Sequence, residues 1–402
     1  MTARIGFDEA LHLTMAHISA LAPVEVSIEK ALNRVLAQDL VAAVDAPSAD
    51  VSLKDGYAIR SSNIESEASE RSVSLKLKGL AGAGDGVRLE LPGGCAARIL
   101  TGARLPIGAD TVVAEEFVTV TEHHVAIPTD SVQGMNVLPR GTDVSAGTRV
   151  LRAGVLLTPG RIGLLAAAGL HRIAAIRIPR VSLVATGNEI RMPGSPLDSG
   201  QLYASNLFTL DAWCRQRGMS STLNIVGDHR TELRGAVEES VATHDAVITS
   251  GGAWTGDRDW MARVMDELGW EKIYHRVRLG PGKAAGFGIL QGKPVFLLPG
   301  GPPSNLLAFL LLALPGLMKL AGHPSPGLVK VPAILSCPVA GHSGWTQAIF
   351  GHFDPTGNSA EFRPLEGASR LIKLAEANGL LLIPEERTRI ANGESITVQR
   401  LA

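Results

Sequence analysis

The chain has 402 residues, which is enough for two or more domains with sizeable cores. Its formal net charge is −1 at pH 7, so the charge gives no support for binding to nucleic acid or to an anionic membrane. The three cysteines lie far apart and form no CxxC pair, which argues against a structural zinc site and against a disulfide scaffold.

Two features of the chain argue against secretion and membrane insertion. The first twenty residues carry Asp8, Glu9, His12 and His17, which do not fit a secretory signal. The longest apolar run, residues 306–314, is too short to span a bilayer. We therefore predict a soluble cytoplasmic protein.

Residues 1–44 predict two helices. Apolar residues recur at helical spacing along one face of the first, at Phe7, Leu11, Met15 and Ile18. The second helix is expected to follow Ser27, whose hydroxyl can cap its N-terminus.

A β-rich block comes after these helices. Segments of strand composition fill residues 73–127 and are separated by glycine turns. Helical character returns at residues 156–170, so the block is expected to be an insertion into a helical region. We expect the inserted domain to cover residues 46–137 and the helical domain to cover residues 1–45 together with 138–175.

Three places in this region offer polar groups for a site. Asp55 and the following glycine precede a strand, Thr101 ends one, and the loop after the block carries Arg140 and Asp143. Taken alone, the first two are more often surface turns, and the loop is more often a solvated connector.

Residues 176–322 alternate between strand and helix patterns. The strands are expected at residues 181–185, 221–226, 246–249, 273–278 and 295–298, and helices near Ser205, Arg230, Asp259 and Ser304. This alternation predicts a mostly parallel sheet with helices on both faces, in an α/β domain that covers residues 176–326.

The ends of these strands point to a site. In open α/β sheets, ligands bind outside the carboxyl ends of the strands, so polar residues at those ends are expected on one edge. The residues that this rule brings together are Gly187, Glu189, Asp228, Ser250, Gly251, Gly252, Pro299 and Gly300. Four strand ends of this composition are hard to explain by packing alone.

The stretch of residues 245–259 allows two interpretations. A strand that ends in Ser250-Gly251-Gly252 and leads into a helix exposes backbone N–H groups that can hold an anion. Asp257 and Asp259 would repel a phosphate unless Mg²⁺ lay between them. The alternative is that both carboxylates cap the helix and stabilise its dipole.

Lys283 comes after another predicted strand and offers a cation for a phosphate or an oxyanion. Its loop does not match GxxxxGK[ST], and no GxGxxG motif follows a strand. These absences argue against a P-loop nucleotide hydrolase and against a nicotinamide dehydrogenase.

Residues 327–402 read as short strands and turns, which predicts a small β-barrel or sandwich. Ser369 in this region is a candidate ligand contact, although a surface serine without a function is the commoner outcome.

Taken together, these motifs resemble the molybdopterin molybdenumtransferase family, whose eukaryotic relative is the E domain of gephyrin. The resemblance runs nearly end to end, and its shared order and spacing carry it. The motifs are DGYA at Asp55, RILTGA at Arg98, LPIGADTVV at Leu105, RGTD at Arg140, ATGNEI at Ala185, SGGAWTGDRD at Ser250, PGK at Pro281 and LPGGPPS at Leu298.

The resemblance implies an enzyme that takes adenylylated molybdopterin, hydrolyses its phosphoanhydride, inserts molybdate into the dithiolene and releases AMP. It also implies Mg²⁺, a molybdopterin adenylyltransferase as a protein partner, and an elongated homodimer. In that homodimer the active cleft lies between the β-rich domain of one subunit and the α/β domain of the other.

Matching motif by motif carries roles over to this chain. The implied catalytic residues are Asp55, Thr101, Asp143, Glu189, Asp228, Asp259 and Lys283, with Glu189, Asp228 and Asp259 holding the metal. The implied substrate contacts add Asp257, Arg140, Arg278, Ser304 and Ser369 to the glycine, proline and serine positions at the strand ends.

The chain also departs from the family pattern. Lys54 replaces Met, Leu138 replaces Arg, Gly280 replaces Lys, Gly301 replaces Asn, and Trp254 stands in the turn before Asp257. We hypothesise an anion pocket rebuilt with other cations, because Arg278 lies two residues before Gly280 and would share its face in a strand. Two alternatives remain open: the same chemistry on a related pterin phosphate, and a non-catalytic cofactor-binding or scaffold protein.

Overall fold

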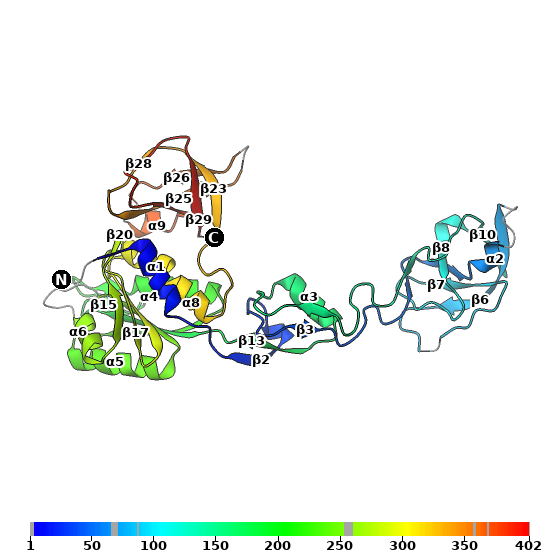
Figure 1. Ribbon diagram of the computed structural model, residues 1–402, viewed down its shortest axis with the longest axis horizontal. Helices are drawn as coiled ribbons and strands as arrows, with labels where there is room; N and C mark the ends of the chain where they lie inside the picture. Colours follow the sequence, from blue (N-terminus) through cyan, green and yellow to red (C-terminus); the bar gives the residue numbers. More distant parts are fainter. Residues whose placement is uncertain are drawn as a thin grey trace.

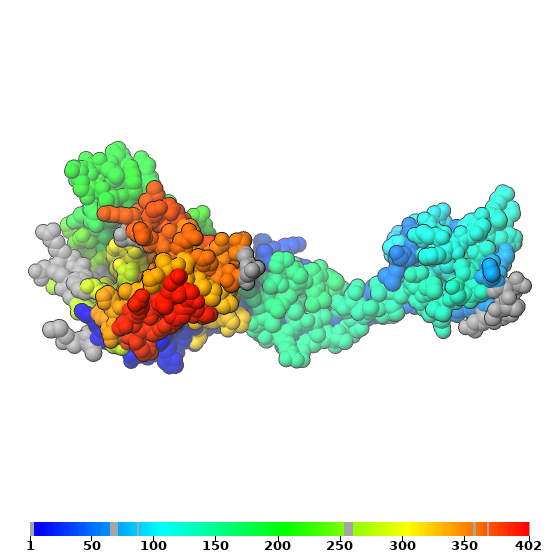
Figure 2. Space-filling model, turned by 90° about the horizontal axis from the view of Figure 1, so that it is seen from above, coloured from blue at the N-terminus to red at the C-terminus, as the bar shows by residue number. Residues whose placement is uncertain are grey.

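The computed structural model describes residues 4–65, 71–86, 88–252, 260–356, 359–367 and 370–401. The molecule is elongated: an α/β part and a C-terminal barrel lie at one end, a small module lies in the middle, and a β-rich block lies at the far end (Figure 1). Viewed from above, a narrow neck joins this block to the rest (Figure 2).

The first N-terminal helix is confirmed and the second is wrong. Helix α1 (Phe7–Ala16) is followed by strand β2 (Pro23–Ser27), which pairs antiparallel with β13 (Arg172–Ile176). Ser27 precedes only a 3₁₀ turn, Ile28–Lys30, and its hydroxyl donates to Glu29. In the segment expected to be helical, Val35 bridges to Leu156 and Leu36 to Ala175, and these long-range pairings outweigh the helical spacing, as tertiary context often does.

A small module lies between the two ends of the molecule. It contains helix α3 (Pro159–Ala167), within the helical stretch predicted at residues 156–170, and the paired strands β3 (Leu40–Val41) and β12 (Arg149–Leu151). Ala31, Leu36, Leu40, Leu157, Leu165 and Ile173 form its buried core.

The predicted β-rich block is confirmed as a six-stranded sheet in the order β8-β5-β7-β6-β10-β9. These strands are Thr111–Ala114, Gly56–Ile59, Cys95–Ile99, Ser72–Ala81, His124–Pro128 and Thr119–Val120. Two antiparallel chain segments form the neck, where β4 (Val51–Ser52) pairs with β11 (Val137–Leu138). A side chain at Gly56 would lie 2.1 Å from the Val113 carbonyl oxygen, which explains a glycine there.

The α/β sheet has the order β17-β14-β18-β22-β21-β19. Its parallel part comprises β17 (Ser220–Val226), β14 (Arg180–Thr186), β18 (Ala246–Ser250) and β22 (Lys293–Leu298), as predicted. Strands β21 (Gly286–Leu290) and β19 (Glu271–His275) continue it antiparallel.

Helices cover both faces of this sheet. The predicted helices are found as α4 (Ser205–Gln216), α5 (Arg230–Thr243), α6 (Trp260–Glu267) and α7 (Pro302–Ala308). Alternate residues of one strand point into separate cores: Leu183 packs on the side of α1 and α4, and Val184 on the side of α5 and α6. This arrangement confirms the predicted layers of the domain.

The strand predicted at residues 273–278 is two strands in different sheets. Strand β19 ends at His275, Arg276 has a φ of +77°, and β20 (Val277–Gly280) then pairs with β25 (Thr346–Asp354) of the barrel. The turn at Arg276 therefore redirects the chain: Val277 and Leu279 stay in the core shared with the α/β sheet, while Arg278 reaches Glu385 of the barrel.

The predicted C-terminal barrel is confirmed as a closed barrel of five strands. These are β23 (Lys330–Leu335), β25, β26 (Glu361–Pro364), β27 (Gly379–Ile383) and β29 (Ser395–Arg400). Pairing of β25 with both β26 and β27 closes the ring.

One continuous helical segment in the described part of the chain, Pro302–Leu320, is long and apolar enough to cross a membrane. Most of it is buried inside the protein, with 83% of its most apolar window covered. It packs against α1 and the α/β sheet, so its apolar character is that of a core helix.

We expect replacement of Asp245 by Asn to destabilise the α/β domain by roughly 2–3 kcal/mol at pH 7, because it leaves Arg177 without its partner. Asp245 is 8% exposed, and Arg177 donates to both carboxylate oxygens at 2.6 and 2.7 Å. This expected loss of unfolding free energy is at or below the smallest values typical of broken buried ion pairs, because Arg177 is 35% exposed. Denaturant unfolding would measure the loss.

The same pair gives a pH dependence. Burial would raise the pKa of Asp245, but hydrogen bonds from Arg177 and the Arg180 N–H, with both positive charges, hold it below its ordinary 3.8. A carboxyl group whose pKa is lowered by folding stabilises the folded state at every pH above its pKa in the unfolded chain. This stabilisation is lost as the pH falls through the pKa of the folded state. The gap between wild type and variant should therefore close below pH 3.8. Glu238→Gln, at an exposed helical ion pair, is the control and should cost under about 0.5 kcal/mol.

Candidate functional site

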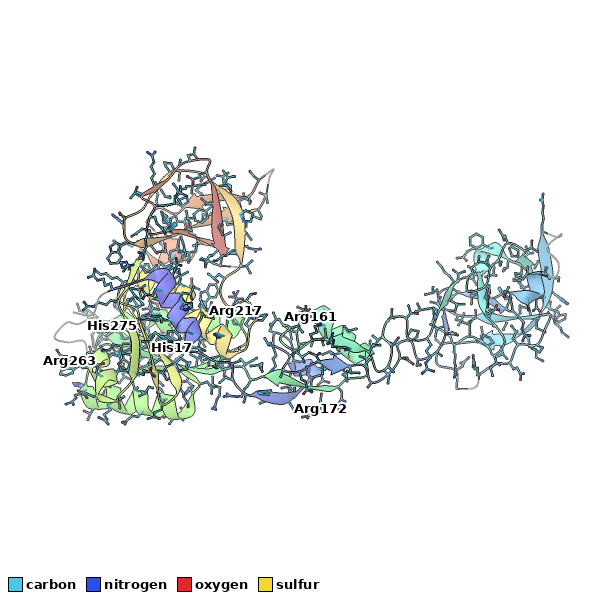
Figure 3. All side chains as sticks on the ribbon, viewed as in Figure 1. His17, Arg161, Arg172, Arg217, Arg263 and His275 are labelled. Atoms are coloured by element: carbon cyan, nitrogen blue, oxygen red, sulfur yellow. The ribbon has the colours of Figure 1, made fainter. Side chains whose placement is uncertain are left out.

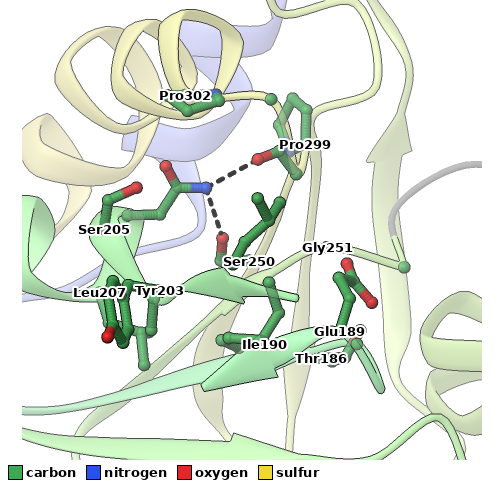
Figure 4. A pocket seen from close by; sticks show the side chains of 18 of the residues that line it. Thr186, Glu189, Ile190, Tyr203, Ser205, Leu207, Ser250, Gly251, Pro299 and Pro302 are labelled. Atoms are coloured by element: carbon green, nitrogen blue, oxygen red, sulfur yellow. Dashed lines mark hydrogen bonds between the residues drawn. The ribbon is translucent and has the colours of Figure 1, made fainter. Parts of the chain in front are cut away.

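A cavity of about 650 Å³ opens at the carboxyl edge of the parallel strands (Figure 4). The ends of β14, β18 and β22, the loop after β17, and the start of α4 contribute its walls. It gathers eight of the predicted site residues: Gly187, Glu189, Asp228, Ser250, Gly251, Gly252, Pro299 and Gly300. The strand-end rule therefore brought together residues that do line one cavity.

Two glycines that line the cavity have backbone conformations that other residues adopt only with strain. Gly251 has a φ of +99°, and a side chain there would lie 2.8 Å from the Thr186 carbonyl oxygen. Gly187 has a φ of +147°, and its side chain would meet the Glu189 carboxylate at 2.6 Å. These positions leave room for a ligand to approach the backbone.

Ser250 joins the two glycine loops of the cavity. Its hydroxyl oxygen accepts hydrogen bonds from the Asn206 amide at 3.1 Å and from the Asn305 amide at 3.0 Å. The same amides donate to the carbonyls of Gly300 and Pro299, both at 2.8 Å. The turn after β18 and the loop after β22 are thus held together by two asparagines.

Sequence reasoning missed both asparagines. Each lies in the first turn of a helix that begins at the cavity, Asn206 in α4 and Asn305 in α7. The strand-end rule considers only the residues directly after a strand, whereas these two reach the same edge from the helices. Applying the rule to helix starts as well would have found them.

Glu189 and Asp228 provide carboxylate oxygens to the cavity. Within the described parts of the chain, neither carboxylate forms a hydrogen bond or an ion pair, and Asp228 is held only through its backbone N–H, which donates to Asn188 at 3.0 Å. Carboxylate oxygens are the ligands that Mg²⁺ prefers, so this donor set fits the ion. The described residues contain no cluster of three metal-binding side chains. The third predicted ligand, Asp259, lies outside the described residues, as do Asp257 and Trp254.

The predicted cations do not line the cavity. Arg278 donates to Glu385 of the barrel at 2.9 Å and to the Arg4 carbonyl at 2.7 Å, because β20 has left the α/β sheet. This pairing corrects the hypothesis that Arg278 replaces the missing lysine. Lys283 precedes Ala284, which does line the cavity, and Ser304 lies in α7 away from the lining.

Asp55 and Thr101 form a pair at the far end of the molecule. The Asp55 carboxylate accepts the Thr101 backbone N–H at 2.6 Å and its hydroxyl at 2.7 Å. These bonds, with the charge of Arg98, hold the pKa of Asp55 below its ordinary value. The pair is exposed and lies in the β-rich block, remote from the cavity of the same chain (Figure 1).

Arg140 and Asp143 lie beside the neck. The Arg140 guanidinium pairs with Asp45 at 2.5 Å, and its backbone N–H donates to Asp50 at 2.8 Å. Asp143 is exposed, and its backbone N–H donates to the Ala46 carbonyl at 3.0 Å. The structure thus places this pair away from the cavity of its own chain. Ser369 lies outside the described residues.

Comparison with protein-family models gives three matches that succeed one another along the chain. Residues 5–169 match the MoeA N-terminal region (domain I and II), residues 182–319 match a family described as "Probable molybdopterin binding domain", and residues 332–401 match the MoeA C-terminal region (domain IV).

Individual proteins agree with these matches. A molybdopterin molybdenumtransferase 2 of Mycobacterium tuberculosis is 32% identical over 388 residues, covering 94% of this chain and 95% of the relative. A molybdopterin molybdenumtransferase of Haemophilus influenzae is 28% identical and covers 93% of each chain. A solved molybdopterin biosynthesis MoeA protein of Pyrococcus horikoshii superposes with a TM-score of 0.84 at 31% identity, over 100% of both chains.

Proposed function

The chain belongs to the molybdopterin molybdenumtransferase family of transferases, which act in molybdenum cofactor biosynthesis, and from this premise we propose its reaction. We propose that it uses Mg²⁺ to insert molybdate into adenylylated molybdopterin and releases AMP. The observation that carries this proposal is the cavity at the strand ends, whose walls are glycine loops and carboxylates.

The glycine loops supply the contact to the phosphates. In the turn of residues 250–252 the Gly251 N–H donates to the Leu298 carbonyl at 3.1 Å, so the Gly252 N–H is the one proposed to contact the ligand, and the 12-residue helix α4 begins at the same cavity. Backbone N–H groups and the positive end of a helix stabilise phosphate charge. Asn206 and Asn305 position this turn through Ser250.

The carboxylates supply the opposite function. Glu189 and Asp228 would hold the magnesium ion, which when bound neutralises charge that develops on the pyrophosphate. A carboxylate that is not occupied by the metal can accept the proton of the attacking water. Lys283 is proposed to neutralise phosphate charge from the next loop, although it does not line the cavity in this structure.

The proposal is tested by supplying adenylylated molybdopterin, molybdate and Mg²⁺ to the purified protein. We expect one AMP to be released for each molybdenum cofactor formed, and we expect this cofactor to reconstitute a cofactor-free molybdoenzyme. Binding of the substrate without AMP release would instead favour a non-catalytic protein.

We further propose that the complete site forms between two copies of the chain. Asp55, Thr101, Arg140 and Asp143 lie in or beside the β-rich block, which is remote from the cavity of the same chain (Figure 1). A partner subunit whose block reaches this cavity would unite the two sets of residues. The four-domain division, a cytoplasmic location and a molybdopterin adenylyltransferase partner are further parts of this proposal.

Mixing two inactive variants tests the shared site. Asp55→Asn and Glu189→Gln impair different halves, so a mixed dimer contains one intact site. Co-expression of the two is expected to restore roughly a quarter of wild-type turnover, because half of the dimers are mixed and each has one working site of two. Co-expression of two Glu189→Gln chains is the control. No recovery in the mixture would show that each chain works alone.

The non-catalytic alternative has one specific observation in its favour. Gly280 stands where the family pattern has a lysine, and a side chain there would lie 2.8 Å from the Gln347 amide nitrogen. A lysine therefore fits only if Gln347 moves. At Gly301, by contrast, an added Cβ has no described atom within 4 Å.

A further inference from the structure

A second polar site lies where the α/β part meets the small module and the barrel. Arg217 comes directly after the last residue of α4. Figure 3 shows it beside the end of the helical segment Pro302–Leu320, from which the chain continues to the barrel. Arg217 lines two cavities. One of about 110 Å³ is shared with Asn33, Met318 and His323, and the other, of about 270 Å³, is shared with Arg400.

No carboxylate of the described residues pairs with the Arg217 guanidinium. Its Nε atom is buried and has no hydrogen-bond partner, and within the described ranges the side chain forms no ion pair. Burial lowers the pKa of Arg217, which is the direction expected for a desolvated cation without a carboxylate. Neither cavity is lined by an aspartate or a glutamate of the described chain. An unpaired buried N–H of a charged group is costly unless something fills the cavity beside it.

A second cation faces the larger cavity. Arg400, near the end of β29, is exposed and forms no ion pair with a described residue, whereas Arg387 in the same barrel pairs with Glu394 at 2.6 Å. The C-terminal carbonyls of α4 carry a partial negative charge of about half an elementary unit, so they offset one guanidinium in part but not two.

His323 neither neutralises this charge nor adds to it at neutral pH. Burial lowers the pKa of His323, and the charge of Arg217 lowers it further. Its Nδ1 accepts the Ser325 N–H at 3.2 Å, so the neutral ring carries its proton on Nε2 as a further donor. The site therefore holds two cations and neutral donors.

We propose that the crevice between Arg217 and Arg400 binds a tetrahedral oxyanion, such as phosphate, sulfate or molybdate. The planar guanidinium fork donates two parallel hydrogen bonds to such oxygens, and two forks on facing elements can hold one dianion. An anion there would link the end of α4 to the last barrel strand, and so fix how the barrel sits on the α/β part.

Thermal unfolding with increasing sulfate, against chloride at equal ionic strength, tests the proposal in solution. Arg217→Met and Arg400→Met keep the aliphatic bulk and remove the charge. We expect sulfate to raise the Tm of the wild type, and each variant to need at least roughly tenfold more sulfate for the same rise. The matched control is Arg215→Met, which removes an exposed α4 arginine paired with Asp211 at 2.7 Å and should respond as the wild type does. Equal responses in all four proteins would overturn the proposal.

Crystals soaked in tungstate locate the anion independently of the catalytic cavity. We expect an anomalous peak within hydrogen-bonding distance of Arg217 and Arg400 in the wild type, and none in Arg400→Met. Because Arg400 is exposed, this substitution should leave the protein folded. A wild-type crevice without a peak, or a peak that persists in the variant, would contradict the assignment. Calorimetric titration with phosphate, sulfate and molybdate then ranks the three anions.

Discussion

Replacing Glu189 by Gln is expected to lower AMP release by roughly a hundredfold or more, the usual effect of removing one preorganised electrostatic group. The carboxylate faces the cavity and has no partner among the described residues, so its charge is available to a metal or a proton. The substitution keeps the size of the side chain and removes only the charge. Steady-state turnover under saturating molybdate measures the effect.

Asp228→Asn should act in the same direction, because Asp228 also lines the cavity. Asp198→Asn is the matched control. Asp198 is an exposed acid in the loop between Glu189 and α4, hydrogen-bonded to Gln201, and it does not line the cavity. Loss of turnover in the control as well would show that general charge, and not the cavity carboxylates, matters. Unchanged turnover in the first two variants would remove both residues from the mechanism.

A single methyl group at Gly251 is expected to reduce turnover by roughly tenfold to a hundredfold, because small misplacements of a binding turn have effects of this size. Alanine at a φ of +99° is strained, and its Cβ would lie 2.8 Å from the Thr186 carbonyl oxygen. That oxygen belongs to the backbone of β14 and cannot rotate away. The turn itself must move, and with it the Gly252 N–H that is proposed to contact phosphate.

Gly300→Ala separates this effect from crowding of the cavity. Gly300 lines the same cavity, but its added Cβ would have an ordinary contact, 3.7 Å from the Gly251 Cα atom. We expect Gly300→Ala to keep turnover within about twofold, since no backbone strain is involved. A large loss in both variants would indicate that any added bulk blocks the substrate, and that the shape of the Gly251 turn is not the cause.

Much of the α/β part was predictable because its signals are local. Buried parallel strands read as short apolar runs, and the loops at their carboxyl ends must meet on one edge of the sheet. Glu189, Asp228 and Ser250 could therefore be placed in one cavity from the strand pattern alone. The closed C-terminal barrel was likewise indicated by its spacing of strands and turns.

The wrong predictions fall where contacts with distant parts of the chain determine the local structure. The segment after Ser27 has helical spacing, but after a short 3₁₀ turn its backbone forms bridges from Val35 to Leu156 and from Leu36 to Ala175. Arg278 was assigned to the cavity because a continuous strand was assumed through Arg276, whose positive φ redirects β20 to the barrel. No local sequence pattern indicates either the loss of the second helix or the change of direction before β20.

Departures from the family pattern have unequal consequences in the structure. At position 301 an added Cβ has no described atom within 4 Å, so no described residue opposes Gly301→Asn at that atom. At Gly280 an added Cβ would meet the end of the flexible Gln347 side chain, so a lysine there requires that side chain to turn away. The residues that line the cavity supply glycine turns and two carboxylates, and Lys283 is not among them.

A crystal structure with AMP and Mg²⁺ bound tests the central proposal most directly. We predict that the phosphate contacts the backbone of residues 250–252, with the metal between the phosphate and the carboxylates of Glu189 and Asp228. A nucleotide that binds elsewhere, while this cavity holds only solvent, would contradict the assignment of the site and the proposed reaction with it.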